Sequence, residues 1–375
     1  MDRKEFLTLY AVQLLVALGF IFGWSLVYLY FVELGFSYWE LLLMNVLTYL
    51  ASLLAIPVLR RISLRSYIRH GILLRVLTFL MVFHFLATPQ LYLLAVVFGV
   101  MLTVFWIPCN IKYFRLNSGA TAQFSGLYFF TWALMGALAP AIAGVVAKVA
   151  GYWAVFGGSI GVLLLAFLVA GRLGEETVDL DWRGAIAGTK GVRTLVFIEG
   201  FWQGVNLIGI PLFTLYFIRE ELALGAFLAY LGLLGALASL LVSRLSDRTR
   251  RRLVFIAPAT ILTAVFTILS GFSKDLYQWA LFQGGVQFFL AILSPFAITV
   301  VIDASRDLTD SIVSREVFLD LGRVAGGVGL AASMYLTGEI RLAIIGSGLA
   351  LLLYPLVLAG NGLYPSELRW RPGAR

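Results

Sequence analysis

Long apolar runs separated by short polar segments dominate the residue pattern of this chain. A helix needs about 20 mostly apolar residues to cross the hydrocarbon core of a membrane, and most of the runs approach or exceed that length. Charged and turn residues bound the runs, so the pattern predicts an all-α membrane protein. It predicts twelve transmembrane helices, at residues 6–32, 38–58, 71–88, 91–111, 121–147, 152–171, 194–217, 222–243, 253–271, 276–302, 314–337 and 341–360.

The longest polar connection divides these helices into two sets of six. A short repeat supports the division, since Leu-Ala-Ser-Leu-Leu at residues 50–54 recurs at residues 237–241. A basic loop follows each copy, as duplication of a six-helix unit would produce. We therefore expect two pseudo-symmetric six-helix bundles, residues 1–171 and 194–375, joined by a cytoplasmic linker at 172–193.

Composition and charge place the chain in a lipid bilayer. Apolar residues make up 61% of the sequence and charged residues 13%, which excludes a water-soluble globular domain. The net charge of +8 does not indicate a nucleic-acid partner, because 22 of the 28 lysines and arginines, Lys112 and Arg315 among them, are assigned to alternate loops with their edges and to the two termini. Cytoplasmic loops of membrane proteins carry this excess. We expect a multi-pass protein of the cell membrane with both termini in the cytoplasm.

The residues that usually hold metals are scarce. Cys109 is the only cysteine, and His70 and His84 are the only histidines, so zinc-binding spacing is absent from the sequence. We expect no metal, no cofactor and a monomeric protein.

The loop after the eighth predicted helix resembles a known family signature. It reads Ser243-Arg-Leu-Ser-Asp247-Arg248-Thr-Arg250-Arg251-Arg252, which is similar to the D-R-x-G-R-R motif of the major facilitator superfamily. Arg250 stands where the family usually has glycine, and the corresponding loop of the first half has Arg60 where aspartate is expected. The resemblance implies that Asp247, Arg248 and Arg251 act in conformational switching.

The fifth predicted helix also resembles a family motif. Its Ala139-Pro140-Ala-Ile-Ala143-Gly144 is similar to the G-P-x-x-G-G core found in antiporters, with alanine at two of the three glycines. The motif favours export over import. The resemblance as a whole implies two bundles that rock about a central cavity lined by helices 1, 4, 7 and 10.

Each of those four helices carries polar and aromatic residues at helical spacing. Polar groups inside a membrane usually face the bundle interior or a wet cavity. On helix 7 the four residues are spaced i, i+3, i+4 and i+7, which places them on one stripe. The alternative is that such side chains join helices or form aromatic belts. We predict a substrate cavity lined by Trp24, Tyr28, Trp106, Asn110, Trp202, Gln203, Asn206, Gln283 and Gln287.

Glu199 is the candidate for proton coupling. It is the carboxylate of the second half that falls well inside a predicted helix next to the polar stripe. A carboxyl group in such a place can load and release a proton during transport. The alternative is a structural ion pair with Arg193.

Charged residues at the start of the eleventh helix are candidates for a gate. Glu316, Asp320 and Arg323 are spaced i, i+4 and i+7, and we expect Arg60 or Arg61 of the first half to pair with one of the two carboxylates. Solvated charges at a helix end are the alternative.

The sequence favours a secondary active transporter over an enzyme. It contains no G-x-x-x-x-G-K-[ST] loop for binding nucleotide phosphates, so a proton or other ion gradient is the expected energy source. The expected substrate is a small neutral, cationic or weakly amphiphilic solute. Two alternatives remain: a membrane enzyme of the glycosyl-transfer type, from Asp179-Leu-Asp181, and a lipid scramblase.

Overall fold

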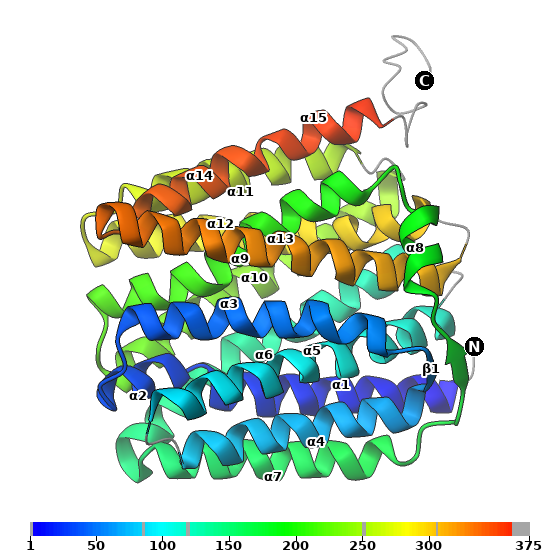
Figure 1. The fold of residues 1–375 in the computed structure, drawn as a ribbon. Helices are drawn as coiled ribbons and strands as arrows, with labels where there is room; N and C mark the ends of the chain where they lie inside the picture. The colour runs from blue at the N-terminus through cyan, green and yellow to red at the C-terminus, as the bar shows by residue number, and fades with distance from the viewer. Residues whose placement is uncertain (1–2, 85–86, 118–120, 250–252, 305–306, 362–375) are drawn as a thin grey trace.

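The chain folds into long helices that run side by side (Figure 1). The computed structural model describes residues 3–84, 87–117, 121–249, 253–304 and 307–361. The first half contains α1 (Arg3–Trp24), α2 (Val27–Glu33), α3 (Tyr38–Ala55), α4 (Leu64–Phe83), α5 (Thr88–Leu116), α6 (Thr121–Ala150) and α7 (Tyr152–Ala170), with a short 3-10 turn, η1 (Ile56–Val58).

The second half repeats this arrangement after a connecting segment. Its helices are α9 (Arg193–Phe217), α10 (Glu221–Thr249), α11 (Leu253–Gly271), α12 (Leu276–Ala304), α13 (Leu308–Thr337), α14 (Arg341–Leu351) and α15 (Leu353–Gly360). Two spans are bent: α1 and α2 together form one, and α14 and α15 form another. Pro355 follows the second break, and a proline there removes one backbone hydrogen bond of the helix.

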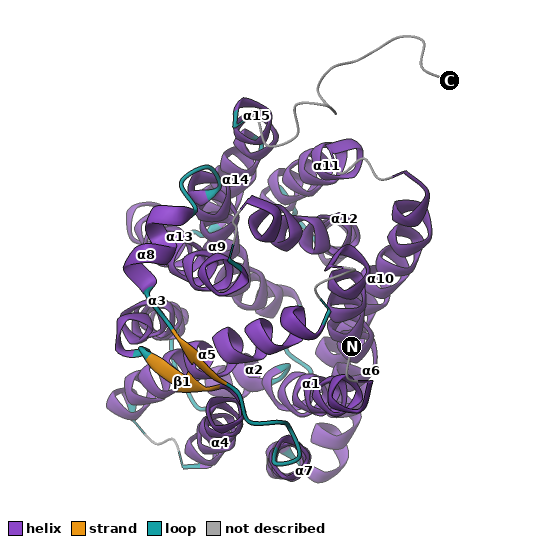
Figure 2. Ribbon diagram, turned by 90° about the vertical axis from the view of Figure 1, so that its right-hand side faces the viewer, coloured by secondary structure: helices purple, strands orange, loops and turns teal. Residues whose placement is uncertain are grey.

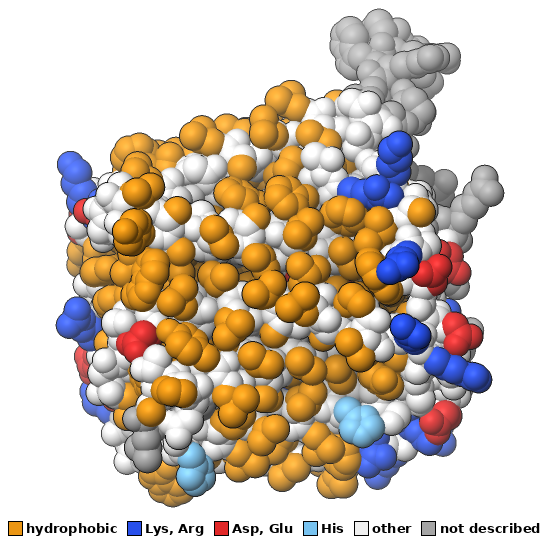
Figure 3. Space-filling view, in the orientation of Figure 1, with side chains coloured by type: hydrophobic (Ala, Val, Ile, Leu, Met, Phe, Trp, Pro, Cys, Tyr) orange, Lys and Arg blue, Asp and Glu red, His pale blue; other side chains and the backbone are white. Residues whose placement is uncertain are grey.

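The predicted fold class is confirmed: the chain is all-α, and its helices form two bundles that lie one above the other (Figures 1 and 2). Within the described residues, eleven segments are long and apolar enough to cross a membrane, and Phe255–Gly271 of α11 is a shorter apolar helix. Hydrophobic side chains cover the face along the helices, while charged side chains gather at the two ends (Figure 3). The protein is a multi-pass membrane protein.

The segment between the two halves is ordered and touches both of them. Its strand β2 (Thr177–Asp179) pairs antiparallel with β1 (Arg61–Ser63) from the first half, with Ile62 opposite Val178. Its short helix α8 (Trp182–Gly188) packs against α13 of the second half. We call this end of the molecule the linker end, and the opposite end the far end.

Glycines allow the closest helix contacts. In α9 and α13, the Gly200/Gly204 and Gly322/Gly326 pairs face one another, and a Cβ on Gly204 would lie 2.2 Å from the carbonyl oxygen of Arg323. The contact between halves formed by α6 and α10 is equally close, since a Cβ on Gly232 would lie 2.1 Å from the Gly136 carbonyl carbon. Small residues let helix backbones approach in this way in membranes.

Two helices are longer at the linker end than the apolar runs predicted, and this corrects the assignment of two basic residues to loops. α5 continues to Leu116, so Lys112 is buried, with its ammonium 2.6 Å from a Glu5 carboxylate oxygen. α13 begins at Leu308, which places Arg315 two turns inside the helix, where it is also buried. Ion pairs make both burials possible, and hydropathy alone does not detect them.

Candidate functional site

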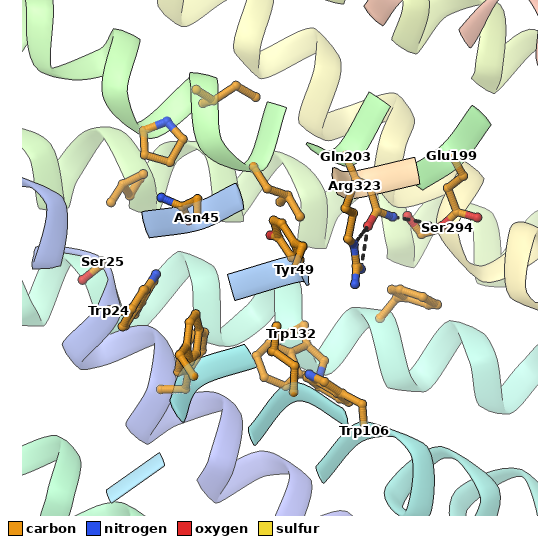
Figure 4. A pocket seen from close by; sticks show the side chains of 18 of the residues that line it. Trp24, Ser25, Asn45, Tyr49, Trp106, Trp132, Glu199, Gln203, Ser294 and Arg323 are labelled. Carbon is orange, nitrogen blue, oxygen red and sulfur yellow. Dashed lines mark hydrogen bonds between the residues drawn. The ribbon is translucent and has the colours of Figure 1, made fainter. Parts of the chain in front are cut away.

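A cavity of about 540 Å³ lies between the two halves (Figure 4). All the residues that line it come from helices or helix junctions of both halves. They are Phe20, Trp24, Ser25, Tyr28, Asn45, Tyr49, Phe98, Leu102, Trp106, Asn110, Tyr128, Phe129 and Trp132 from the first half, and Glu199, Gln203, Leu207, Ile210, Pro211, Thr214, Leu215, Leu224, Leu228, Ser294, Ile298, Arg315, Glu316 and Arg323 from the second.

The two halves contribute walls of different chemistry. Among the described lining residues, the first-half wall holds every aromatic one and no charged one. In the same set, the second-half wall holds all the charged residues and no aromatic one. A solute in the cavity therefore contacts π-faces on one side and charged groups on the other.

Stacked rings make the first-half wall rigid. The rings of Trp24 and Phe98 stack with centroids 4.3 Å apart, and Phe20 stacks on Phe98 at 5.8 Å. Nearer the linker end, the Trp106 and Trp132 rings lie 5.2 Å apart. Offset and tilted arrangements of this kind are favourable for aromatic pairs. Figure 4 shows Trp106 and Trp132 across the cavity from Gln203.

An arginine lies directly behind this aromatic wall. Arg75 of α4 is 1% exposed, and its guanidinium carbon lies 4.5 to 5.3 Å from the ring centroids of Phe20, Phe105 and Trp106. Its Nε donates to the Met101 sulfur at 3.1 Å, while its Nη1 has no hydrogen-bond partner among the described residues. Cation–π contacts thus take the place of a carboxylate as the main compensation for this charge.

The charged side chains of the second half form one connected cluster. Arg315 Nη2 donates to Glu199 Oε1 at 2.8 Å, and Arg315 Nη1 lies 3.4 Å from Glu316 Oε1. Arg323 Nη1 donates to Asp320 Oδ1 at 2.8 Å. We call these five residues the charge cluster.

Gln203 joins the two parts of the charge cluster. Its Nε2 donates to Glu199 Oε1 at 3.0 Å, and its Oε1 accepts from Arg323 Nε at 3.0 Å and from Nη2 at 2.7 Å (Figure 4). A half-buried amide that both donates and accepts fixes the relative positions of its neighbours. Gln203 thereby couples α9 to α13 at the level of the cavity.

The structure places five of the nine predicted cavity residues on the wall: Trp24, Tyr28, Trp106, Asn110 and Gln203. The spacing on helices 1 and 4 therefore identified the face that borders the cavity.

The predicted placement of the other four is corrected. On α9, Trp202 donates to Thr267 of α11 at 3.0 Å and Asn206 donates to Ser347 of α14 at 3.0 Å. Successive helix residues differ by about 100° in direction, so the face that holds Glu199 and Gln203 turns Trp202 and Asn206 toward neighbouring helices. The four residues spaced i, i+3, i+4 and i+7 cover too wide an arc of α9 to face the cavity together.

On α12 neither predicted glutamine lines the cavity. Gln283 is fully buried and donates to Ser270 of α11 at 2.9 Å, and Gln287 lies outside the lining, with its backbone oxygen 3.9 Å from a Cβ built on Gly235 of α10. Ser294 and Ile298 border the cavity instead. The Gln283 amide thus joins α12 to α11 inside the second half, as polar side chains between membrane helices often do.

Glu199 lines the cavity, but its ion-pair partner is not Arg193, the residue named in the alternative prediction. Its carboxylate pairs with Arg315, whereas Arg193 donates to the backbone oxygen of Ile186 in α8. Arg315 was counted with the loop charges at the start of its predicted helix, so it was not considered as a partner of Glu199.

The predicted gate, in which Arg60 or Arg61 pairs with Glu316 or Asp320, is not formed in the structure. Arg60 and Arg61 lie in or beside β1 and are exposed, and Arg61 Nε lies 3.8 Å from Asp179 Oδ1 of β2. Asp320 instead accepts from Ser52 of α3 at 2.5 Å and pairs with Arg323. The strand pairing holds Arg61 away from α13, so the predicted pairing is wrong in this conformation.

The switch residues of the second half cannot be placed. Asp247 and Arg248 fall in α10, but their side chains lie outside the described part of the chain, as does Arg251. Their role in switching stays a prediction.

Sequence reasoning missed several lining residues. Asn45 and Tyr49 are spaced i, i+4 on α3, and Tyr128 and Trp132 have the same spacing on α6. This spacing was the signal that could have identified them, but it lies on helices outside the expected four. Tyr28 Oη donates to Asn45 Oδ1 at 2.7 Å, so α2 and α3 shape the wall together.

Comparisons with known proteins define the fold. No family model matches the chain, and no curated protein sequence matches it. Among solved structures, the chain resembles the human organic anion transporter MFSD10 (TETRAN), with a TM-score of 0.68 and 14% identity over 95% of this chain and 99% of that one.

Two further structures give the same result. The E. coli fucose:proton symporter FucP matches with a TM-score of 0.70 and 12% identity over 96% of this chain and 98% of its own. A POT family transporter in complex with a thioalcohol-conjugated peptide matches at 0.73 and 11% identity, over 98% and 97%. The chain thus has the major facilitator fold, as the sequence resemblance implied.

Proposed function

We propose that this protein is a secondary active transporter that moves a small solute across the cell membrane by alternating access. The observation that carries the proposal is the cavity between the halves, whose walls come from both bundles. A solute bound there contacts both halves at once, so their relative rotation changes its access to each side. Membrane transporters with repeated halves bind solutes at such an interface.

Contacts between the halves at both ends supply the two gates of this proposal. At the linker end, Arg115 Nη2 of α5 donates to Thr309 Oγ1 of α13 at 2.8 Å. At the far end, Lys148 Nζ lies 3.0 Å from Glu220 Oε1, and the Tyr38 and Tyr216 rings stack at 5.0 Å. The Lys148–Glu220 pair is exposed, and exposed ion pairs contribute about 0–1 kcal/mol, so this far-end contact can break at small cost.

Proton coupling through Glu199 is part of the proposal. The carboxylate borders the cavity and shares Arg315 with Glu316, so it can exchange its arginine for a proton without leaving the wall. A carboxyl group that borders the cavity and shares its one arginine is a suitable coupling site. The proposed direction is export, and both chain termini are placed in the cytoplasm.

The structure weighs against the alternative of a glycosyl-transfer enzyme. The two carboxylates of Asp179-Leu-Asp181 both have structural roles at the linker end. Asp179 lies beside Arg61 in the strand pair, and Asp181 accepts from the backbone nitrogen of Arg183 at 3.1 Å at the start of α8.

Proteoliposomes with a trapped pH indicator test the proposed function. Organic cations, neutral sugars and organic anions are added one at a time while the internal pH is followed. Transport coupled to protons predicts a solute-dependent pH change with the purified protein and none in empty liposomes. Lipid movement without any solute or gradient would support the scramblase alternative, and an absence of solute-dependent proton movement in every class would contradict proton-coupled transport.

A further inference from the structure

The charge cluster carries one negative charge more than it can neutralise. Its carboxylates are Glu199, Glu316 and Asp320, and its guanidiniums are Arg315 and Arg323. Asp320 and Arg323 form one pair, so Glu199 and Glu316 share the single Arg315. Among the described residues, the charged side chains that interact with Glu316 are these four others, from α9 and α13.

Glu316 is the less compensated of the two carboxylates. Glu199 accepts from Arg315 at 2.8 Å and from Gln203 at 3.0 Å, whereas the Arg315 nitrogen nearest Glu316 is 3.4 Å away. Glu316 is 9% exposed. A buried charge without a partner is costly in a membrane, so this site has a strong preference for one more positive charge.

The opposite wall offers aromatic faces to such a charge. Three of the nine lining rings already face an arginine: Phe20 and Trp106 contact Arg75, and Tyr49 contacts Arg323. Tyr128 lies close enough to interact electrostatically with Glu316 and Arg315. Trp132 lies 5.2 Å beyond Trp106 and has no arginine over its ring among the described cation–π contacts.

These observations define the chemistry of the solute, on the assumption that the cavity is the transport site proposed above. We infer that the cavity binds a lipophilic organic monocation. Its charged centre lies between Glu316 and Glu199 on one side and Tyr128 and Trp132 on the other. Its apolar groups extend toward the far end, where Leu207, Leu224 and Leu228 line the wall.

Charge arithmetic distinguishes this class from the others. One monocation makes the cluster neutral, a neutral solute leaves its charge uncompensated, and an anion adds a second negative charge. Cations also gain from the aromatic wall, since ring faces attract positive charge. The cation meets its carboxylates on one half and its rings on the other, so its binding favours closure of the halves around it.

Binding to the purified full-length protein tests the inference with three probes of similar shape. Tetraphenylphosphonium is a monocation, tetraphenylborate is an anion of the same shape, and triphenylphosphine oxide is neutral. Isothermal titration calorimetry in detergent is expected to show saturable binding of tetraphenylphosphonium, with at least about tenfold weaker binding of the other two. Equal binding of cation and anion would overturn the inference.

Two substitutions locate the charge. Glu316→Gln should weaken tetraphenylphosphonium binding by at least about tenfold, because the cluster then has no excess charge. The matched control is Glu33→Gln, the same change at an exposed glutamate that does not line the cavity and whose carboxylate accepts from Tyr152 Oη. Trp132→Leu should weaken binding more than Trp132→Phe, which keeps a ring. Unchanged affinity in Glu316→Gln would overturn the placement of the charge.

The charge selectivity of the unmodified protein decides the inference even if a variant fails to fold. The experiments can contradict the cation site without contradicting the proposed transport function, and the reverse. Proton movement coupled only to neutral or anionic solutes would leave transport intact and contradict the cation site. Selective cation binding without any flux would support the site and contradict the transport function.

Discussion

The hydroxyl of Ser52 donates a 2.5 Å hydrogen bond to Oδ2 of Asp320, and this contact joins the two halves of the protein beside the cavity. Ser52 lies near the linker end of α3 and is 2% exposed, and Asp320 is 1% exposed. The same hydroxyl contacts Thr103 Oγ1 at 2.9 Å, so α3, α5 and α13 meet here. A buried contact of this kind is a candidate latch for the linker end.

Ser52→Ala should favour the conformation that opens at the linker end. A hydrogen bond to a charged group contributes about 1.5–3 kcal/mol, of which Asp320 recovers part through Arg323. A net loss of about 1 kcal/mol shifts the equilibrium by roughly fivefold. The measurement is the labelling rate of Ser294→Cys on the cavity wall, with a membrane-impermeant thiol reagent added from the linker side, in a Cys109→Ser background.

The control for this experiment is Ser333→Ala. Ser333 is at the far end of α13, and its hydroxyl donates to the backbone oxygen of Glu339 within the second half. Faster labelling in Ser52→Ala but not in Ser333→Ala is expected. The same labelling rate in both variants would show that the Ser52 contact does not hold the linker end closed.

The contact of α9 with α13 should tolerate no added methyl group. A Cβ on Gly204 would lie 2.2 Å from the Arg323 carbonyl oxygen and 2.6 Å from its Cα, and backbone cannot move aside as a side chain can. We expect Gly204→Ala to destabilise the protein by about 1–3 kcal/mol and to displace Arg323 from Gln203. Thermal unfolding in detergent measures the loss.

Gly161→Ala in α7 is the matched control, because a Cβ there meets no atom within 4 Å. Alanine has the higher helix propensity, so this variant should be as stable as the original or slightly more stable. Equal melting temperatures for Gly204→Ala and the original protein would contradict the close approach of the two backbones.

Hydropathy predicted the membrane-spanning helices because lipid imposes length and apolarity on each span. The spacing of Gly200/Gly204 and Gly322/Gly326 is typical of close contacts between membrane helices, and the structure has such a contact there. The strand pair β1–β2 could not be predicted, since its two strands of three residues each lie far apart in sequence. Its formation depends on the fold that brings the first loop beside the linker.

The candidate site was only partly predictable, for a geometric reason. Spacing along a helix identifies which residues share a face, but not what that face contacts, so Gln203 and Trp202 were assigned to the same wall. Arg315 was missed because its charge suggested a loop, and its carboxylate partner Glu199 lies 116 residues away. Pairing across helices is a property of the packed structure.

Arg75→Lys should lower the stability of the first half. The planar guanidinium contacts three aromatic rings at 4.5 to 5.3 Å, and an ammonium group cannot stack on them in the same way. Burying a lysine also costs more free energy than burying an arginine, because the compact ammonium charge is more strongly hydrated. Thermal unfolding should show a lower melting temperature than that of the original protein.

Arg69→Lys is the control for this substitution, because Arg69 is only half-buried and contacts one ring, that of Phe167, at 4.2 Å. A smaller decrease in melting temperature is expected there. If both variants lost equal stability, the three-ring environment of Arg75 would have no special contribution.

Glu199→Gln should abolish proton-driven solute flux in proteoliposomes. The amide keeps the shape of the side chain and its place beside Arg315, but it cannot bind and release a proton. Arg315 then has Glu316 as its remaining carboxylate, so the cluster becomes neutral and has no site for an additional positive charge.

Glu199→Asp keeps a carboxyl group and should retain part of the flux. Glu33→Gln, at the far end, should behave as the original protein does. Normal pH-driven flux in Glu199→Gln would remove this residue from the coupling mechanism, whereas loss in both Glu199→Gln and Glu199→Asp would show that position matters as much as the titratable group.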